Sequence, residues 1–403
     1  MVHKISQALV DECVLLDVTR LFGRALSSVM ATGVDRVGLA YVEHYYARAR
    51  AVLAEGRFVA VLTKKDSKKA FDALLHPTSQ SKSILKRLIL KARLSAWYRL
   101  KIPEKVLINT AHSGVNHHAY AIGLRKRGVK LLFMVHDVIP ITHPEFCRPK
   151  EKQKHYNRVN HMLGYGHGII TNSLFTLNAL ERESEILGVK MPPSTVAHLA
   201  PGFSPKSYEL SPYQQPYFVV LGTIEPRKNH NLLFRVWRKL VDELGDSAPK
   251  LIIIGRRGWE CENAIDILER SEVLRGFIIE KNACSDDELS SILHHAQALL
   301  FPSLVEGYGM PVIESLMVGA PVIATNLSVF HEIAGDIPDY LDCLDGLGWL
   351  SHIKAYMEND HPLRLAQLER MKQFNTPTWK AHFAKVDALI GELVQVNNGL
   401  GAN

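Results

Sequence analysis

The sequence predicts an α/β protein that is built from two doubly wound domains. Short apolar segments alternate with segments of helical length along most of the chain, which is typical of βαβ units around a parallel sheet. The alternation pauses at a stretch rich in Pro, Ser and Tyr (200–217) and then starts again. The chain has 403 residues, and single cores stop growing at roughly 250–300 residues. We therefore expect a linker in that stretch, an N-terminal domain over residues 1–205 and a C-terminal domain over residues 206–377.

Five apolar segments predict the strands of the first domain. "CVLLDVT" opens the series and precedes a helical run that we expect from Asp35 to Leu53. The five expected strands lie within residues 13–19, 57–63, 105–110, 130–137 and 168–173. In doubly wound sheets ligands bind at the carboxyl ends of the strands, so two such domains that face each other would form one cleft.

Five further segments predict the strands of the second domain, and a helix follows them. The strands are expected within residues 217–223, 250–255, 276–282, 298–303 and 321–325. The segment "TPTWKAHFAKVDALIGELV" (376–394) has apolar residues at helical spacing, including Trp379, Phe383, Val386 and Leu389. It predicts an amphipathic helix that packs outside the last unit.

The composition narrows the class of protein. The five cysteines are widely spaced and form no Cys-x-x-Cys pair, which argues against a disulfide framework or a zinc site and fits a reducing cytosol. No signal peptide opens the chain, and no apolar run reaches the ~20 residues that a membrane span needs. We therefore expect a cytoplasmic protein. The net charge of +7 leaves nucleic acid, anionic lipid and phosphorylated substrates open as partners.

The stretch "FPSLVEGYGMPVIESLMVGAPVIAT" (301–325) places two glutamates on either side of a glycine loop. The glycines suit unusual backbone dihedrals or a close approach of the backbone to a ligand. Pro311 fits the first turn of a helix, so we expect Glu314 in that first turn and Glu306 in the loop before it. An acid in a first turn also has a purely structural explanation, because it complements the helix dipole. Glu306 has less structural reason to lie where it does.

The stretch "VVLGTIEPRKNHNLLFRVW" (219–237) predicts an anion site. A strand is expected to end at Gly222, and the loop after it carries two adjacent cations, Arg227 and Lys228. Asn229 is expected to cap the helix that follows. Two cations beside a helix N-terminus suit a phosphate or diphosphate. A solvated basic turn is the alternative, but cations there oppose the helix dipole, and a bound anion would remove the conflict.

Histidines follow two strands of the first domain. His136 comes at the end of "KLLFMVHD", where chemistry usually lies in α/β sheets; a role in holding a loop is the alternative. A second group, in "AHSGVNHH" (111–118), is expected to contact an acceptor and comprises His112, Ser113, His117 and His118. Zinc is the alternative there, but the histidines lack the usual helical spacing and a fourth ligand.

The two motifs of the second domain resemble those of the retaining GT-B glycosyltransferases of family 4. "EGYGMPVIES" has the Glu-x7-Glu pattern of that family, and "GTIEPRKNH" resembles its donor-phosphate motif. The resemblance covers nearly the whole chain and is greatest to bacterial enzymes that build O-antigen or capsular polysaccharide. It also rests on "TGVDRV" (32–37), "HDVIPITHPEF" (136–146), "TNSLFT" (171–176) and "ATNLSVFHEIAGD" (324–336).

The resemblance implies a GT-B fold, in which two Rossmann-like domains face a central cleft. It implies that the N-terminal domain binds the acceptor, that the C-terminal domain binds the nucleotide sugar, and that a final helix (378–397) returns to the N-terminal domain. Many relatives have a basic residue where this chain has Thr223, so the chain lacks that third cation.

The resemblance also implies roles for single residues. Arg227 and Lys228 would hold the donor diphosphate, Glu314 the ribose, and Glu306 the transferred sugar. From the first domain, Gly33 would approach the diphosphate from the loop after the first strand, and His136 would lie beside the reacting sugar. The expected catalytic residues are His136, Arg227, Lys228 and Glu306. The other expected donor contacts are Gly33, Gly222, Thr223, Gly307, Tyr308, Gly309, Met310, Pro311 and Glu314.

The predicted function is a retaining transfer of a hexose, in the first instance mannose from GDP-mannose, to a growing or lipid-linked bacterial surface glycan. A UDP- or dTDP-sugar donor, a GT-B epimerase or phosphorylase, and a non-catalytic glycan-binding module are the alternatives. We expect no metal or other cofactor, because the chain has no Asp-x-Asp motif and fixed cations can stabilise the leaving group. We expect no nucleic-acid partner.

The densest basic set lies in residues 81–105. It holds Lys82, Lys86, Arg87, Lys91, Arg93 and Arg99 among apolar residues. This pattern predicts an amphipathic helix at an anionic inner-leaflet surface, where a polyprenyl-linked acceptor would lie. An ordinary surface helix that packs on the sheet is the alternative.

Overall fold

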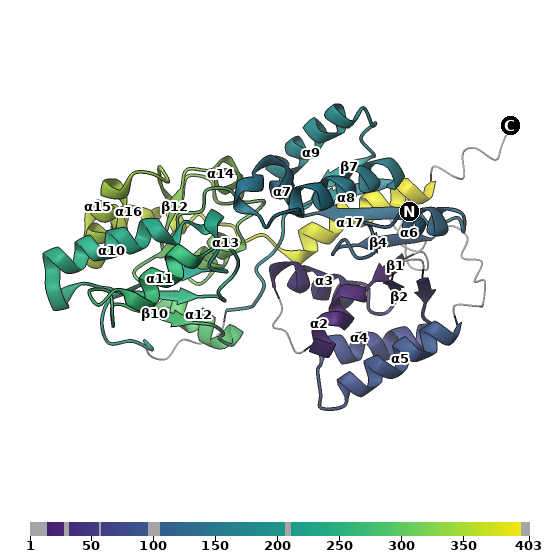
Figure 1. The fold of residues 1–403 in the computed structure, drawn as a ribbon, viewed down its shortest axis with the longest axis horizontal. Coiled ribbons are helices and arrows are strands. Elements are labelled where there is room, and N and C mark those ends of the chain that lie inside the picture. Colours follow the sequence, from purple (N-terminus) through teal and green to yellow (C-terminus); the bar gives the residue numbers. More distant parts are fainter. Residues whose placement is uncertain (1–13, 28–31, 56–57, 96–104, 206–210, 396–403) are drawn as a thin grey trace. The chain divides into compact units, whose positions relative to one another are not determined.

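The computed structural model describes residues 14–27, 32–55, 58–95, 105–205 and 211–395. The chain divides into two compact units. Unit 1 comprises Met1–Val138, Gln153–Leu199 and Thr378–Asn403, and unit 2 comprises Ile139–Lys152 and Ala200–Pro377. In each unit helices surround one largely parallel sheet (Figure 1). The predicted α/β class is therefore confirmed.

The division differs from the expected domain boundary in two respects. It falls between Leu199 and Ala200 rather than after residue 205, and the segment Ile139–Lys152 groups with unit 2. Within unit 2, Trp259 Nε1 donates to the carbonyl oxygen of Phe146 (3.3 Å), and the Arg148 guanidinium lies 5.0 Å from the centroid of the Trp259 ring. These contacts hold the segment in unit 2. Part of the expected linker, residues 206–210, lies outside the described residues.

A seven-stranded sheet in the order β3-β2-β1-β4-β5-β6-β7 forms the centre of unit 1. The strands are β1 (Val14–Asp17), β2 (Arg50–Glu55), β3 (Phe58–Val61), β4 (Val106–Asn109), β5 (Lys130–Val135), β6 (Gly168–Thr171) and β7 (Ser194–Val196). The helices are α2 (Thr19–Ser27), α3 (Gly33–His44), α4 (Lys64–Leu75), α5 (Ser81–Ser95), α6 (His118–Arg125), α8 (Glu151–Tyr165), α9 (Leu174–Leu187) and α17 (Trp379–Gln395). The order 3-2-1-4-5-6 is that of a doubly wound sheet.

Unit 2 contains a six-stranded parallel sheet in the order β10-β9-β8-β11-β12-β13. The strands are β8 (Tyr217–Leu221), β9 (Lys250–Ile254), β10 (Ile278–Lys281), β11 (Leu299–Phe301), β12 (Val322–Thr325) and β13 (Asp339–Leu341). The helices are α7 (Ile139–Thr142), η1 (Pro144–Phe146), η2 (Pro226–Lys228), α10 (His230–Leu244), η3 (Gly245–Ser247), α11 (Glu262–Arg270), α12 (Asp286–His294), α13 (Met310–Met317), α14 (Ser328–Ala334), α15 (Gly346–Met357) and α16 (Pro362–Met371). Trp237 of α10 and Trp349 of α15 are fully buried in its core.

Two expectations about the first domain are wrong. The helical run expected over residues 35–53 is a helix, α3, followed by the strand β2, because the short apolar run "AVLA" suits a buried strand as well as a helix. The strand β3 pairs with β2 in the antiparallel sense, with Glu55 opposite Phe58. Only two residues separate them, and a parallel pair needs a crossover of a dozen or more residues. The three-residue strands β7 and β13 were not predicted.

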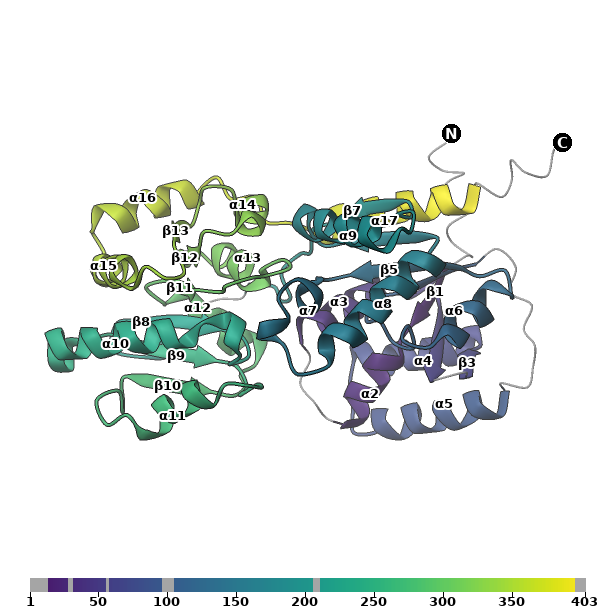
Figure 2. The same cartoon turned by 45° about the horizontal axis from the view of Figure 1, so that its top comes forward.

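The final helix α17 packs in unit 1, beside β7 (Figure 2), and it also contacts β4 and β6. Its buried face also meets α3. The Tyr41 hydroxyl lies 2.9 Å from His382 Nε2, and the His44 ring stacks on Phe383 with 3.8 Å between the ring centroids. The predicted apolar positions Phe383, Val386 and Leu389 are buried. The amphipathic pattern therefore marks the face that covers the sheet, and residues 396–397 of the expected helix lie outside the described residues.

Candidate functional site

Two loops of unit 2 meet where the strand order of its sheet reverses. β8 and β11 are neighbours in the sheet, although β9 and β10 lie between them in the sequence. The carboxyl end of each strand leads into one of the predicted motifs, residues 222–229 after β8 and residues 302–309 after β11. The Leu304 N–H donates to the Arg227 carbonyl (2.8 Å) and joins the two loops. Ligands of doubly wound sheets bind at such a switch point.

The loop after β8 is packed tightly against the loop after β9. A Cβ atom on Gly255 would lie 1.9 Å from the Gly222 carbonyl oxygen, so only glycine fits at position 255. Gly222 has a φ of +142°, and Thr223 is half-buried with its methyl group facing Gly258. The backbone of the expected phosphate loop is therefore held in place by its contacts with the loop after β9.

Asn229 does not cap α10 as expected. It occupies the position before the helix, but its φ of +55° is left-handed, and no side-chain capping bond forms. Its side-chain amide donates instead to the Cys343 carbonyl (3.1 Å). Asn229 therefore ties this loop to the segment before α15.

Four charged side chains form a buried ion-pair network between the two loops. Arg227 Nε lies 2.6 Å from Glu225 Oε1, and Arg227 Nη1 lies 2.7 Å from Glu306 Oε2. Lys228 Nζ pairs with Glu306 Oε1 and lies 4.4 Å from the centroid of the Phe301 ring. Lys228 and Glu306 are only 8% and 7% exposed. The ion-pair network, Glu225, Arg227, Lys228 and Glu306, thus holds two cations and two carboxylates.

Burial and ion pairing compete at the two carboxylates of the network. Burial is the largest influence on Glu306 and favours its neutral form, but Arg227 and Lys228 together outweigh it and lower its pKa to about 2. At Glu225 burial prevails over the same two cations, and its pKa is raised above the ordinary value. Glu306 therefore holds its negative charge more firmly than Glu225 does, and it is the stronger ion-pair partner of the two cations.

The helix α13 begins after a glycine that no other residue could replace without strain. Gly309 has a φ of +111°, and a Cβ atom there would lie 2.7 Å from Phe330 Cε1. Because this conformation starts the helix at Met310, Pro311 lies in the first turn as predicted. Glu314 lies in the second turn rather than in the first, which corrects the sequence prediction. The dipole explanation for Glu314 is correspondingly weaker.

Glu314 is buried and faces a different part of unit 2 from Glu306. Its Oε1 accepts a hydrogen bond from the Gly202 N–H (3.0 Å). Gly307, Tyr308 and Gly309 are buried between the two glutamates, while Met310 and Pro311 are half-buried. The loop–helix junction therefore directs one carboxylate at the cations and the other at the backbone of Gly202.

In unit 1, the rings of His136 and His112 each hydrogen-bond to a main-chain carbonyl at the end of the neighbouring strand. His136, after β5, has Nε2 2.7 Å from the Thr110 carbonyl beyond β4, and His112, after β4, has Nε2 2.6 Å from the Met134 carbonyl of β5. Burial is the main cause that lowers both pKa values, so both rings are neutral at pH 7 and donate from Nε2. Their ring centroids are 5.8 Å apart. His112 has a left-handed φ of +60°, which is rare outside glycine and marks this turn as a functional candidate.

The structure separates the other expected acceptor residues from His112. The carbonyl of Ser113 accepts from the Asn109 side chain (2.8 Å), which keeps this residue in the turn after β4. His118 instead meets α8, with its ring nitrogens 3.1 Å from His161 Nε2 and 3.2 Å from the Tyr165 hydroxyl. His117 is exposed at the N-cap of α6. The four residues therefore do not form a single group.

Gly33 lies at a different place from the one expected. The helix α2 separates it from β1, so it is not in the loop directly after the first strand but is the first residue of α3. Next to it, Asp35 is buried, accepts the Thr32 N–H, and pairs with Arg20 Nε (2.6 Å). Arg20 and Asp35 both act on the pKa of His136. The first turn of α3 and His136 thus share one charged environment.

Sequence reasoning missed two carboxylates. Glu225 stands two residues before Arg227 in the same motif, and that spacing was the available signal. Asp17 ends β1 at the switch point between β1 and β4 and accepts from the Tyr120 hydroxyl (2.9 Å) and the Thr19 N–H (3.0 Å). Burial raises the pKa of Asp17 to about 6, against the effect of these hydrogen bonds.

The described residues contain no group of three or more His, Cys, Asp and Glu side chains that is arranged to hold a metal ion. That transfer needs no metal stays a prediction. Its basis is that Arg227 and Lys228 can stabilise the leaving group, not that a metal-binding group was not found.

A family model for glycosyl transferases group 1 matches residues 206–337. O-antigen chain mannosyltransferase B of Escherichia coli is 27% identical over 61% of this chain and 66% of its own length. The serotype-specific mannosyltransferase WbdA of Escherichia coli is 31% identical over 41% of this chain and 20% of its own length. The chain thus spans less than two thirds of either relative.

The fold has close counterparts among solved structures. The Anabaena protein HepE, solved in complex with UDP and glucose, superposes with a TM-score of 0.63 over 97% of this chain and 99% of its own, at 14% identity. The resemblance found in the sequence is thereby confirmed. Residues 206–337 match the glycosyl transferases group 1 model, and the fold of the chain is of the GT-B type.

Proposed function

We propose that the protein is a glycosyltransferase that takes a hexose from a nucleotide sugar and transfers it, with retention and without a metal, to a bacterial surface glycan. The observation that carries this proposal is the buried ion-pair network at the β8/β11 switch point. Two cations, Arg227 and Lys228, pair there with the same carboxylate, Glu306, between the two loops that contain the family motifs. The similarity to mannosyltransferases favours mannose, with GDP-mannose as the first donor to test.

The network suggests how the donor is held. Glycosyl transfer leaves negative charge on the departing diphosphate, and preorganised cations stabilise such charge best where water is excluded. Without donor, Glu306 occupies Arg227 and Lys228. When the diphosphate takes these cations, the Glu306 carboxylate is released to accept hydrogen bonds from hydroxyls of the transferred sugar. Glu314, which accepts a hydrogen bond from the Gly202 N–H, is assigned to the ribose diol, because both carboxylate oxygens are hydrogen-bond acceptors.

Several residues of the donor and acceptor sites stay predictions. His136 and Gly33 of unit 1 are proposed donor contacts, and His112 and Ser113 are proposed acceptor contacts. His117 and His118 lose support as members of the same group because His118 binds α8. A UDP-sugar donor is the second candidate, since the structural counterpart HepE was solved with UDP and glucose.

We also propose that α5 meets an anionic membrane surface. Leu90 and Leu94 are 62% and 70% exposed and lie one turn apart, and Lys86 and Arg87 lie one turn before Leu90. The opposite face of α5 packs on α4 and β3. Lys91 and Arg93 instead pair with Asp66 and Glu55, and Arg99 lies outside the described residues. None of the helices in the described part of the chain is long and apolar enough to cross a membrane.

The test is donor turnover in a panel of GDP-, UDP- and dTDP-sugars, with and without glycan acceptor, followed by release of the nucleoside diphosphate. Arg227→Ala should lower kcat by about 10²–10³-fold, which is typical for the loss of one preorganised donor. Arg270→Ala is the matched control, because Arg270 is an exposed cation of unit 2 that pairs with Asp266 on the surface of α11. The anomeric configuration of the product, read by proton NMR, tests retention. Wild-type turnover in Arg227→Ala at saturating donor would contradict the proposed role.

A further inference from the structure

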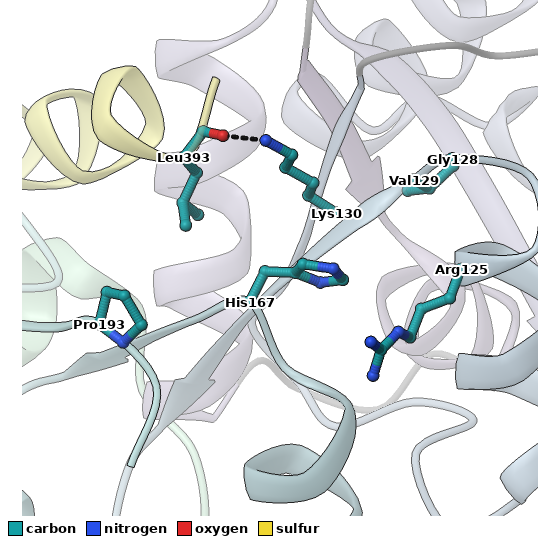
Figure 3. A pocket seen from close by; sticks show the side chains of 7 residues that line it. All are labelled: Arg125, Gly128, Val129, Lys130, His167, Pro193 and Leu393. Atoms are coloured by element: carbon teal, nitrogen blue, oxygen red, sulfur yellow. Dashed lines mark hydrogen bonds between the residues drawn. The ribbon is translucent and has the colours of Figure 1, made fainter. Parts of the chain in front are cut away.

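A cavity of about 450 Å³ (Figure 3) lies at the amino-terminal ends of strands of the unit 1 sheet, whereas His136 lies at the carboxyl ends. Lys130 begins β5, His167 precedes β6 and Pro193 precedes β7, so three strand amino termini border it. His136 follows the other end of β5, and a strand of six residues spans roughly 20 Å. The cavity is therefore separate from the residues that we assign to donor and acceptor. Its lining comprises Arg125, Gly128, Val129, Lys130, His167, Pro193 and Leu393.

The three polar side chains that line this cavity, those of Arg125, Lys130 and His167, all carry hydrogen-bond donors. His167 Nδ1 accepts the Leu131 N–H (3.0 Å), which fixes the tautomer with the proton on Nε2. Burial first, and then Arg125 and Lys130, lower the pKa of His167 to about 4, so the ring is neutral at pH 7. In Figure 3 the ring points toward the space between Lys130 and Arg125. None of the described lining residues is acidic.

The two cations are held in place by main-chain carbonyls. Lys130 Nζ donates to the Leu393 carbonyl in the last turn of α17. Arg125 Nη1 lies 3.5 Å from the Gly164 carbonyl, and its guanidinium lies 6.0 Å from the centroid of the Tyr165 ring. Such contacts order the side chains and reduce the entropy that a ligand must remove. The sequence "RKRGVK" (125–130) adds two exposed cations beside the cavity.

The size of the cavity limits the class of anion. A water molecule takes about 30 Å³ of liquid volume, so the cavity exceeds what an inorganic phosphate fills. Pockets of roughly 300–1,000 Å³ bind small organic ligands. Val129, Pro193 and Leu393 supply an apolar part of the wall. An anion with an attached organic group matches both parts of the lining.

We propose that this cavity binds a phosphate ester, with the phosphate among Arg125, Lys130 and His167 Nε2–H and the organic part against Val129, Pro193 and Leu393. The site is additional to the donor and acceptor sites and does not depend on the proposed transfer reaction. The ester has two natural sources, a soluble phosphorylated metabolite or the headgroup of a lipid, and the chemistry of the phosphate is the same in both.

The soluble source is tested by calorimetry of the full chain with sn-glycerol 3-phosphate, with glycerol as the uncharged control. Arg125→Gln and Lys130→Gln should each weaken binding by about tenfold or more, because each removes a charge-assisted hydrogen bond. Lys126→Gln is the matched control: it loses the same charge one residue away, outside the lining, and should change affinity less than about twofold. Arg227→Ala should leave this binding intact, which separates it from phosphate binding at the proposed donor site.

The lipid source is tested by sedimentation with phosphatidylcholine vesicles that contain or lack phosphatidic acid. All proteins in this assay carry glutamine at Lys82, Lys86 and Arg87, so that α5 does not contribute to vesicle binding. Lipid-dependent sedimentation that Arg125→Gln removes and Lys126→Gln retains then assigns the site to a headgroup. Because Lys130→Gln also removes a contact of α17, the His167 Cε1–H resonance is followed by NMR in the wild-type protein as a second readout. It should move on titration with either phosphate ligand. Binding in neither arm, equal loss in Lys126→Gln, or loss in Arg227→Ala would overturn the proposal.

Discussion

Replacing Glu306 with glutamine should tighten the binding of nucleoside diphosphate while it slows transfer. Glu306 pairs with both Arg227 and Lys228, the two cations that the proposed donor phosphates need. Its pKa falls from the ordinary 4.5 to about 2, which corresponds to about 3 kcal/mol of preference for the ionised carboxylate in this site. A diphosphate that binds Arg227 and Lys228 displaces the Glu306 carboxylate, so part of this free energy is lost when the diphosphate binds. If half is lost, the penalty is about 1.5 kcal/mol, or about tenfold in Kd.

Glutamine keeps the size of the side chain but removes the charge that competes with the phosphates. Calorimetry with GDP and UDP should therefore show about tenfold tighter binding to Glu306→Gln, whereas kcat with the full donor should fall because the sugar loses a carboxylate partner. Glu243→Gln is the matched control, since Glu243 pairs with Lys354 on the surface and should change neither quantity. An unchanged or weaker affinity for both diphosphates in Glu306→Gln would refute the idea that the carboxylate occupies the phosphate site.

Three further predictions address pH, metal and membrane. The pKa of Glu306 is lower in the folded chain than its ordinary 4.5, so its stabilising effect should be complete above about pH 4.5 and lost toward pH 2. Acidification from about pH 5 to 3 should therefore reduce the free energy of unfolding of the wild type more than that of Glu306→Gln. Equal losses in the two proteins would contradict the ion pairing. Transfer should persist in EDTA because the network supplies the cations; loss that magnesium or manganese restores would show a metal requirement. Changing Lys82, Lys86 and Arg87 to glutamine should weaken sedimentation with anionic vesicles by roughly 1 kcal/mol for each residue, and unchanged binding would leave α5 as an ordinary surface helix.

The strands that the sequence located well are those with short, dense apolar runs. β5 and β9 are fully or almost fully buried between helices, and such strands read as continuous hydrophobic segments. The end of α3 was misplaced because the apolar run of β2 has no periodicity that separates a strand from a buried helix. β7 and β13 contain three residues each, which gives too short a window for any pattern.

The motif residues were found from the sequence, but their partners were not. Arg227 and Glu306 are 79 positions apart, and they meet only because β11 pairs with β8 rather than with its sequence neighbour β10. Strand order at a switch point depends on packing across the whole sheet, so local patterns do not contain it. The same limit explains His118, whose partner His161 comes from α8, a helix that follows the next strand, β5. Glu225 lay within reach of the motif, yet its pairing with Arg227 depends on a buried geometry that spacing does not specify.

The return of α17 to unit 1 has a consequence for how the chain acquires its structure during synthesis. Every described segment of unit 2 has been translated by Pro377, whereas unit 1 still lacks the helix that covers β4, β6 and β7. At about 5–20 residues per second, the ribosome needs roughly ten to forty seconds to pass from Leu199 to α17. Unit 2 is therefore the first of the two to become complete, although unit 1 begins the chain. During that interval Tyr41 and His44 lack their partners His382 and Phe383. A fragment that ends at Leu199 should therefore expose apolar sheet surface. To stay in solution it should require a chaperone, or α17 added as a separate peptide.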